Sequence, residues 1–195
     1  MIFKNSIKHS LRGLTYTLSF TLLLHAFPAH ATEAEDRIAA HQAMAVESNQ
    51  WQDWPTGPVI SAESAILMDA DTGVILYSKN IHTPQYPASI TKILTTLIAM
   101  ERCSLDEMVT FSYKATHDID PGSNHIGIDS KEQLSMEDCL KAILIRSANE
   151  VSFGVAEHIA KDSWENFAPI MNQRAKELGC LNSNFVNPNG LPDDN

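Results

Sequence analysis

The sequence predicts a mixed α/β fold in which a β hairpin precedes a mostly helical block. Two β-rich runs, Ala65 to Met68 and Val74 to Tyr77, flank the polar turn Asp69-Ala70-Asp71-Thr72-Gly73, and this arrangement is typical of a hairpin. Apolar residues at helical spacing then follow over 89–101, 135–147, 151–160 and 164–178. With 195 residues and 44% hydrophobic content, the chain can bury a sizeable single core.

The first 31 residues have the pattern of a secretory signal peptide. Three basic residues precede an apolar run from Leu14 to Phe27, and Ala29-His30-Ala31 follows as an A-x-A cleavage site. An uncleaved N-terminal anchor is the alternative. Such a signal would direct the chain to the periplasm or cell surface, and cleavage after Ala31 would leave Thr32 as the mature N-terminus. We interpret the polar, aperiodic residues 32–60 as an N-terminal lead-in and residues 61–195 as the domain proper.

The net charge argues against nucleic acid as a partner. The formal charge is −10 at pH 7, and loss of residues 1–31 removes three basic residues and no acidic ones, which gives −13. Proteins that bind phosphate backbones need a basic surface instead.

Neither the cysteines nor the histidines form a pattern typical of a metal site. Cys103, Cys139 and Cys180 are an odd number without C-x-x-C spacing, so buried unpaired thiols are favoured over a disulfide. Residues 116–129 mix His and Asp, but without a helical His spacing a solvated loop is the better interpretation. We therefore expect no metal and no cofactor.

Ser89 and Lys92 are the most informative residues, because they lie three positions apart at the start of an apolar helix. Side chains at i and i+3 share one helix face with Cβ atoms about 5–6 Å apart, within hydrogen-bond reach of each other. A serine hydroxyl becomes a good nucleophile when a base takes its proton, and a lysine can do so only when neutral. Such a pair also occurs by chance on surface helices, so other features must support it.

A second polar pair, Ser147 and Asn149, follows the helix that Ser135 begins. Ser135 and Asp138 have the spacing of a capping box, with Asp in place of the usual Glu or Gln. This helix delivers Ser147 at its end. A helix end that is merely held by small polar residues is the structural alternative for the pair. Gly179 then predicts the end of the last helix.

Four segments in order carry a family resemblance that extends from about Trp54 to Asn195. They are the 65–77 hairpin, Pro87-Ala88-Ser89-Ile90-Thr91-Lys92, Ser147-Ala148-Asn149-Glu150 and Phe185-Val186-Asn187-Pro188-Asn189-Gly190-Leu191. Together they closely resemble the serine D-alanyl-D-alanine carboxypeptidases, the low-molecular-mass penicillin-binding proteins of peptidase family S11, which use S-x-x-K and S-x-N elements. The resemblance implies a β-lactamase/transpeptidase-like fold. In that fold an antiparallel sheet backed by helices packs against an all-helical lobe, with the active site between them.

The resemblance also implies a role for each candidate residue. Ser89 would attack the penultimate D-Ala carbonyl of a peptidoglycan stem peptide that ends in D-Ala-D-Ala, and Lys92 would be the general base. Ser147 would relay a proton to the leaving amine, and Asn149 would orient Lys92 or the substrate. The backbone N–H of Ser89 would form half of an oxyanion hole. β-Lactams would be covalent inhibitors.

The third family element, K-T-G, does not occur in the sequence. In the family it lies on a later strand, binds substrate and completes the oxyanion hole. We therefore expect the chain to be the N-terminal part of the enzyme, without the C-terminal strands and inactive alone, with any membrane anchor in the part that follows. A class A β-lactamase, with Asp where Ala148 stands, and a non-catalytic wall-binding pseudoenzyme are the alternatives. The sequence does not separate carboxypeptidase from endopeptidase activity.

Overall fold

The computed structural model describes residues 31–120 and 122–192, which divide into two compact units on either side of the Pro84–Gln85 bond. Residues 1–30 of the predicted signal peptide lie outside the described residues. Among the described residues, no helix is long and apolar enough to cross a membrane.

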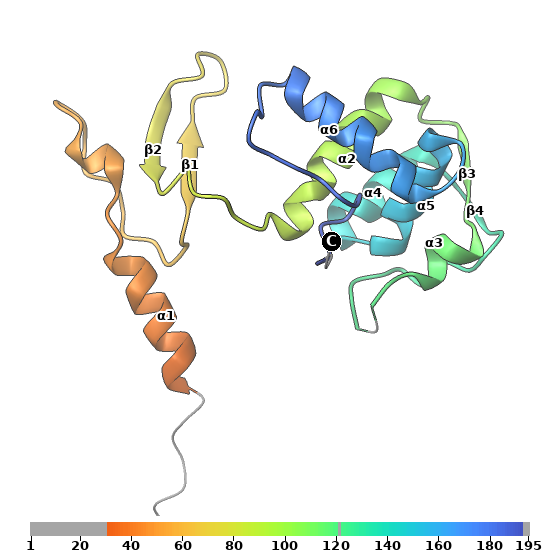
Figure 1. Ribbon diagram of the computed structural model, residues 1–195, viewed down its shortest axis with the longest axis horizontal. Coiled ribbons are helices and arrows are strands. Elements are labelled where there is room, and N and C mark those ends of the chain that lie inside the picture. The colour runs from red at the N-terminus through yellow and green to blue at the C-terminus, as the bar shows by residue number, and fades with distance from the viewer. Residues whose placement is uncertain (1–30, 121, 193–195) are drawn as a thin grey trace, which may run out of the picture. The chain divides into compact units, whose positions relative to one another are not determined.

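The first unit contains the predicted hairpin. Strands β1 (Ala65–Met68) and β2 (Ile75–Lys79) pair antiparallel, with Ala65 opposite Lys79 and an irregularity between Leu67 and Met68 (Figure 1). In the turn, the Asp69 carboxylate accepts hydrogen bonds from the backbone N–H and the hydroxyl of Thr72, at 2.8 and 2.6 Å. The hairpin prediction is therefore confirmed.

Residues 32–60 contain helical structure that the sequence analysis did not predict. Helix α1 spans Ala31–Ala43, and a 3₁₀ helix, η1, spans Glu47–Gln50. The described side chains of α1 are mostly exposed. Its one large apolar residue is Ile38, and alanines and polar residues make up the rest, so the sequence gives only a weak periodic signal of a helix.

A buried lysine joins the parts of this first unit. Lys79, 1% exposed, donates hydrogen bonds from Nζ to the main-chain oxygens of His41, Ile60 and Ala62, at 2.6, 3.1 and 2.7 Å. Three carbonyls match the three donors of an ammonium group, which offsets the cost of its burial. The end of α1 and the 60–62 segment are thereby held against β2.

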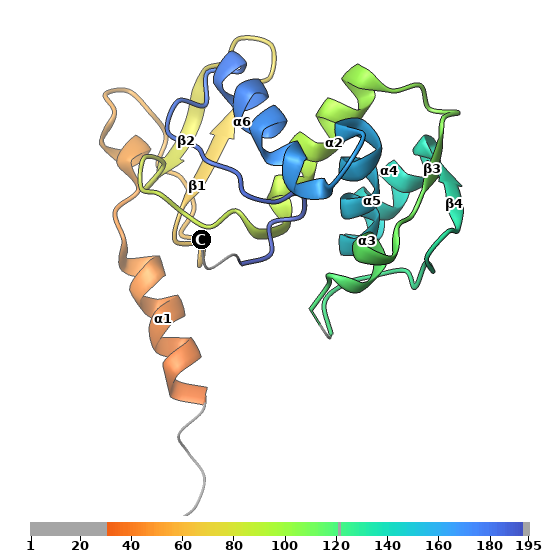
Figure 2. The same cartoon turned by 45° about the vertical axis from the view of Figure 1, so that its right-hand side comes forward.

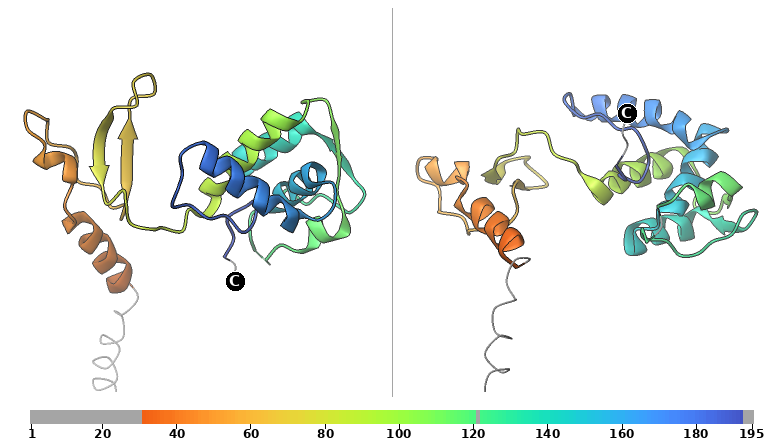
Figure 3. Two further views of the ribbon diagram at one scale, coloured as in Figure 1. Left: turned by 45° about the horizontal axis from the view of Figure 1, so that its top comes forward. Right: turned by 60° about the horizontal axis from the view of Figure 1, so that its bottom comes forward.

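The second unit is mainly helical. Its principal helices are α2 (Thr91–Arg102), α4 (Met136–Arg146), α5 (Asn149–Ala160) and α6 (Ala168–Glu177), with short helices η2 (Ala88–Ile90), α3 (Tyr113–His117) and η3 (Trp164–Phe167). Helix α5 contacts α2, α3, α4 and η3, while α6 lies along α2 (Figures 2 and 3). The four predicted helices are confirmed, with 3₁₀ turns at the start of the first and last.

Two three-residue strands in this unit were not predicted. β3 (Met108–Thr110) pairs antiparallel with β4 (Gln133–Ser135), with Val109 opposite Leu134. A strand of three residues is too short to show the alternation of apolar and polar residues by which strands are predicted.

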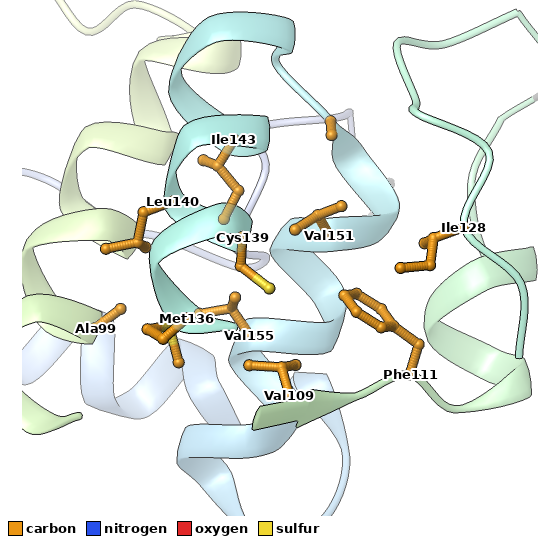
Figure 4. Packing of buried hydrophobic residues seen from close by; sticks show 11 residues of the cluster. Ala99, Val109, Phe111, Ile128, Met136, Cys139, Leu140, Ile143, Val151 and Val155 are labelled. Atoms are coloured by element: carbon orange, nitrogen blue, oxygen red, sulfur yellow. The ribbon is translucent and has the colours of Figure 1, made fainter. Parts of the chain in front are cut away.

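The core of the second unit lies between α4, α5 and β3 (Figure 4). Phe111 packs directly on α5, because a Cβ atom at Gly154 would lie 2.4 Å from its ring. A second cluster is formed by residues of α2, α5, η3 and α6. The two sets of buried apolar residues are Ala99, Val109, Phe111, Ile128, Met136, Cys139, Leu140, Ile143, Ala148, Val151 and Val155, and Ile98, Ala156, Phe167 and Met171.

Local signals fix the ends of these helices. The Ser135 side chain accepts the Asp138 N–H at 3.1 Å and so caps α4, as predicted. At the end of α6, Gly179 has φ +86°, and the N–H groups of Gly179 and Cys180 donate to the carbonyls of Lys176 and Ala175. This is a Schellman motif, which confirms the predicted C-cap.

All three cysteines are unpaired. The preference for free thiols over a disulfide is thus confirmed, but their burial is correct only for Cys139. Cys103 is partly exposed and Cys180 is exposed.

Candidate active site

Ser89 lies on an exposed 3₁₀ turn immediately before α2. Ala88, which precedes it, has φ +47°, a left-handed conformation that is rare for a residue with a Cβ atom and that often marks a functional site. Lys92 lies in the first turn of α2, 2% exposed. Its Nζ is 3.0 Å from the Ser89 hydroxyl oxygen. The predicted proximity of hydroxyl and amine is therefore present.

Lys92 makes two further hydrogen bonds. Nζ donates to the side-chain oxygen of Asn149 at 2.8 Å and to the main-chain oxygen of Asn189 at 2.9 Å. A neutral amine has two N–H donors and one lone pair. Since two of the three neighbours are oxygens that can only accept, they take both N–H groups and leave the lone pair directed at Ser89. The geometry thus supports proton transfer from Ser89 to Lys92.

Burial also changes the acidity of Lys92. Removal from water disfavours the ammonium form and lowers the pKa of Lys92 to about 8. Among the described residues, no ion pair includes Lys92, so no carboxylate opposes this shift. A base with a pKa near the working pH combines a useful neutral fraction with sufficient basicity.

The corner between α4 and α5 supplies the other two predicted residues. Ser147 ends α4 in a left-handed conformation, φ +56°, and its hydroxyl donates to the Ser89 hydroxyl oxygen at 3.0 Å. Asn149 begins α5 and is buried. The chain therefore turns directly from α4 into α5. This turn brings the Ser147 side chain into hydrogen-bond contact with Ser89, and the Asn149 side chain with Lys92.

The Asn187–Leu191 turn contributes a contact that sequence reasoning did not assign. The Asn187 side chain accepts the Gly190 N–H at 2.7 Å and donates to the Leu191 carbonyl at 2.8 Å. The Thr95 hydroxyl donates to the Pro188 carbonyl at 2.7 Å, which ties the turn to α2. The main-chain oxygen of Asn189 is thereby fixed beside Lys92. The sequence Asn-Pro-Asn-Gly predicts a turn, but it does not predict that the turn contacts Lys92.

Gly190 allows this turn to approach the nucleophile. It has φ +80°, and a Cβ atom there would lie 1.9 Å from the Ala88 main-chain oxygen. Only glycine fits both the backbone conformation and the space.

Glu150 holds a neighbouring loop against the same corner. Its buried carboxylate accepts the N–H groups of Ile126 and Gly127, at 2.6 and 3.2 Å, and the Asn149 N–H donates to the Asn124 carbonyl at 2.9 Å. These bonds order part of the 116–129 segment, which was interpreted as a solvated loop. Three possible metal ligands lie close together outside this segment, among the residues that the structure describes. They are Cys103, Glu107 and His158.

An exposed serine, a buried lysine with a lowered pKa and a second hydroxyl 3.0 Å from the serine oxygen are the groups that a serine acyl-transfer site with a lysine base requires.

Comparison with known proteins agrees with this class. The family model described as D-alanyl-D-alanine carboxypeptidase, peptidase S11, matches residues 49–195. D-alanyl-D-alanine carboxypeptidase DacF of Bacillus subtilis is 40% identical over 137 residues, which cover 68% of this chain and 34% of that protein. DacA of Haemophilus influenzae is 33% identical over 163 residues, which cover 81% and 41%.

Solved structures show the same fold. D-alanyl-D-alanine carboxypeptidase DacD from Francisella tularensis matches with a TM-score of 0.66 and 30% identity over 72% of this chain and 34% of that one. Penicillin-binding protein 5 from Haemophilus influenzae matches with a TM-score of 0.65 and 33% identity, over 71% of this chain and 42% of that one.

The chain belongs to the S11 D-alanyl-D-alanine carboxypeptidase family, and it has part of the penicillin-binding protein fold that the sequence resemblance implied. It spans roughly a third to two fifths of the length of these two curated relatives, 34% and 41%.

Proposed function

We propose that the protein is a serine D,D-carboxypeptidase that removes the terminal D-Ala from peptidoglycan stem peptides through an acyl-enzyme. The main support is the geometry of the Lys92 amine, because its hydrogen bonds to Asn149 and Asn189 direct its lone pair at Ser89. Family membership supports the substrate class, because the curated relatives are named D-alanyl-D-alanine carboxypeptidases.

Acylation begins with transfer of the Ser89 hydroxyl proton to neutral Lys92. Ser89 Oγ then bonds to the carbonyl carbon of the penultimate D-Ala, and the carbonyl oxygen takes up negative charge. The backbone N–H of Ser89, one turn before a helix, is a donor for that oxygen.

Collapse of this intermediate breaks the amide bond to the terminal D-Ala. The leaving amine needs a proton, and Ser147 supplies one from its position 3.0 Å from Ser89. Lys92 returns the proton that it took, through the Ser147 hydroxyl. Water then hydrolyses the ester to release the shortened peptide and regenerate Ser89.

Release of D-Ala from a peptide ending in D-Ala-D-Ala tests this function on the intact protein. Ser89→Ala should abolish release, whereas Ser61→Ala, which removes an exposed hydroxyl in the other unit, should leave it unchanged. Undiminished release by Ser89→Ala would refute the proposal. Cleavage of peptide cross-links without D-Ala release would assign an endopeptidase, and rapid turnover of β-lactams would instead favour a β-lactamase.

We also propose that the protein is exported and cleaved after Ala31. The support is the basic n-region, the apolar run to Phe27 and Ala29-His30-Ala31. N-terminal sequencing of the protein from an extracytoplasmic fraction should begin at Thr32. A mature protein that begins at Met1 would contradict cleavage.

A further inference from the structure

Three side chains of different chemistry converge beside the end of α2. Cys103 follows the last residue of α2, Glu107 lies in the loop before β3, and His158 lies in the last turn of α5. One ligand atom from each, sulfur, carboxylate oxygen and ring nitrogen, lies within 4.8 Å of the others, and all three residues are partly buried. This Cys103–Glu107–His158 cluster shares no residue with the candidate active site.

Main-chain bonds hold the cluster in place. The Cys103 N–H donates to the Ala99 carbonyl at 2.9 Å and caps α2, and the Glu107 carbonyl accepts the Met136 N–H at 2.8 Å. One Glu107 carboxylate oxygen accepts the Ser104 N–H at 2.7 Å, while the other lies 2.9 Å from His158 Nε2. Glu107 is therefore oriented by an outer hydrogen bond, as metal-binding carboxylates usually are.

The donor set fits zinc. Zn²⁺ binds thiolate, imidazole and carboxylate at about 2.0–2.3 Å, which places neighbouring ligand atoms of a tetrahedral site roughly 3–4 Å apart. The cluster reaches this spacing with small side-chain movements. Sulfur and nitrogen ligands also disfavour magnesium and calcium, which prefer oxygen.

The surroundings leave room for entry and for a fourth ligand. Part of the cluster faces a surface pocket lined by Arg102, Cys103, Glu107, Ile159 and Lys161. Thiolate and carboxylate together balance the charge of a divalent cation. Metal binding would replace the proton of the Cys103 thiol.

We propose that Cys103, Glu107 and His158 bind one zinc ion, with a fourth position open to water or an anion from solution. The ion would join the end of α2 and the loop before β3 to α5. The alternative is a His158–Glu107 ion pair beside an uninvolved thiol.

Metal titration of the reduced, chelator-treated intact protein tests the site. Zinc should bind at one ion per chain by calorimetry. Cobalt(II) should give the near-ultraviolet charge-transfer band of a thiolate ligand. Cys103→Ser should abolish that band, and both Cys103→Ser and His158→Gln should weaken zinc binding by more than the roughly 10–100-fold that outer-sphere changes cause. Cys180→Ser, which removes an exposed cysteine outside the cluster, should change neither.

Alkylation of the unmutated protein gives a second readout that does not depend on folding of a variant. Zinc should protect Cys103 from iodoacetamide and leave Cys180 reactive, as measured by peptide mass spectrometry. Absence of stoichiometric zinc binding, or equal alkylation of Cys103 with and without zinc, would overturn the proposal and leave the ion pair alone.

Discussion

Lys92 is buried, and its three hydrogen-bond neighbours suit both its protonated and its neutral form. As an ammonium it donates to Ser89, Asn149 and Asn189, and as an amine it keeps the last two bonds and accepts from Ser89. The same three contacts therefore hold the side chain in place before and after the proton moves. The proposed proton transfer would therefore need little rearrangement of the site, which is the advantage of preorganised groups.

The lowered pKa of Lys92 predicts how acylation depends on pH. Because burial lowers this pKa to about 8, the neutral fraction rises with pH and reaches roughly a tenth at pH 7. The second-order rate of acylation by a β-lactam should rise about tenfold for each pH unit well below 8 and level off above it. Stopped-flow or quenched labelling between pH 5.5 and pH 9.5 measures this profile. A rate that continues to rise toward the ordinary lysine pKa of about 10.4 would contradict the role of burial.

At the scale of single residues, the sequence predicted side chains better than backbone atoms. Ser89 and Lys92 could be paired because helical spacing fixes which side chains meet. The Asn189 carbonyl could not be assigned, since every residue has one and only the folded turn selects it. The proximity of Cys103 to His158 was not predicted either, because the packing of the folded chain rather than sequence spacing brings them together.

At the scale of elements, the site depends on two tight turns that press against the start of α2. The α4–α5 corner contributes Ser147 and Asn149, and the Asn187–Leu191 turn contributes the Asn189 carbonyl. Each turn contains a left-handed residue, Ser147 or Gly190, at the point of approach. The left-handed conformation is strained for Ser147 but not for Gly190, which has no Cβ atom, and a strained residue persists where the surrounding structure holds it in place.

Gly190→Ala tests the close approach of the second turn. The new Cβ atom would collide with the Ala88 carbonyl. The variant should therefore be less stable by roughly 1–3 kcal/mol from overpacking and by a further backbone penalty of about 1 kcal/mol. Gly179→Ala is the matched control, because Gly179 has a similar φ of +86° but no atom within 4 Å of the added Cβ. Chemical denaturation measures both. Equal losses of stability would show that the contact with Ala88 contributes nothing.

Element prediction succeeded where periodicity extends over several turns. The helices at 91–102, 136–146 and 168–177 bury one part of their surface and expose the rest, whereas the helix at 149–160 buries every residue from Asn149 to Ala156. The caps at Ser135 and Gly179 follow local chemistry. Helix α1 has only one large apolar residue, and β3 and β4 have three residues each, so none of the three gives a strong periodic signal.

At the scale of the whole molecule, the two compact units differ in how much apolar surface they bury. The second unit has two buried clusters, whereas the hairpin of the first exposes large apolar side chains on both strands. These are Ile66, Leu67 and Met68 on β1 and Leu76 on β2, which together with Val74 in the turn are 37–57% exposed. A two-stranded hairpin is marginally stable alone, and exposed apolar patches promote association.

Residues 32–195 expressed alone should therefore bind a hydrophobic dye and self-associate. Leu67→Lys combined with Leu76→Lys should reduce both effects without changing the helical circular dichroism signal, since both positions lie on strands. Light scattering and dye fluorescence over a concentration series give the measurement. A monomer with no dye binding at any concentration would contradict this expectation.

Covalent labelling of the intact protein by fluorescent penicillin tests the central assignment most directly. Label should map to Ser89 by mass spectrometry, because a β-lactam acylates the same hydroxyl as the D-Ala-D-Ala amide. Ser89→Ala should abolish labelling, Lys92→Ala should nearly do so, and Ser61→Ala should label normally. Label that persists in Ser89→Ala and maps to another residue would show that the nucleophile is elsewhere.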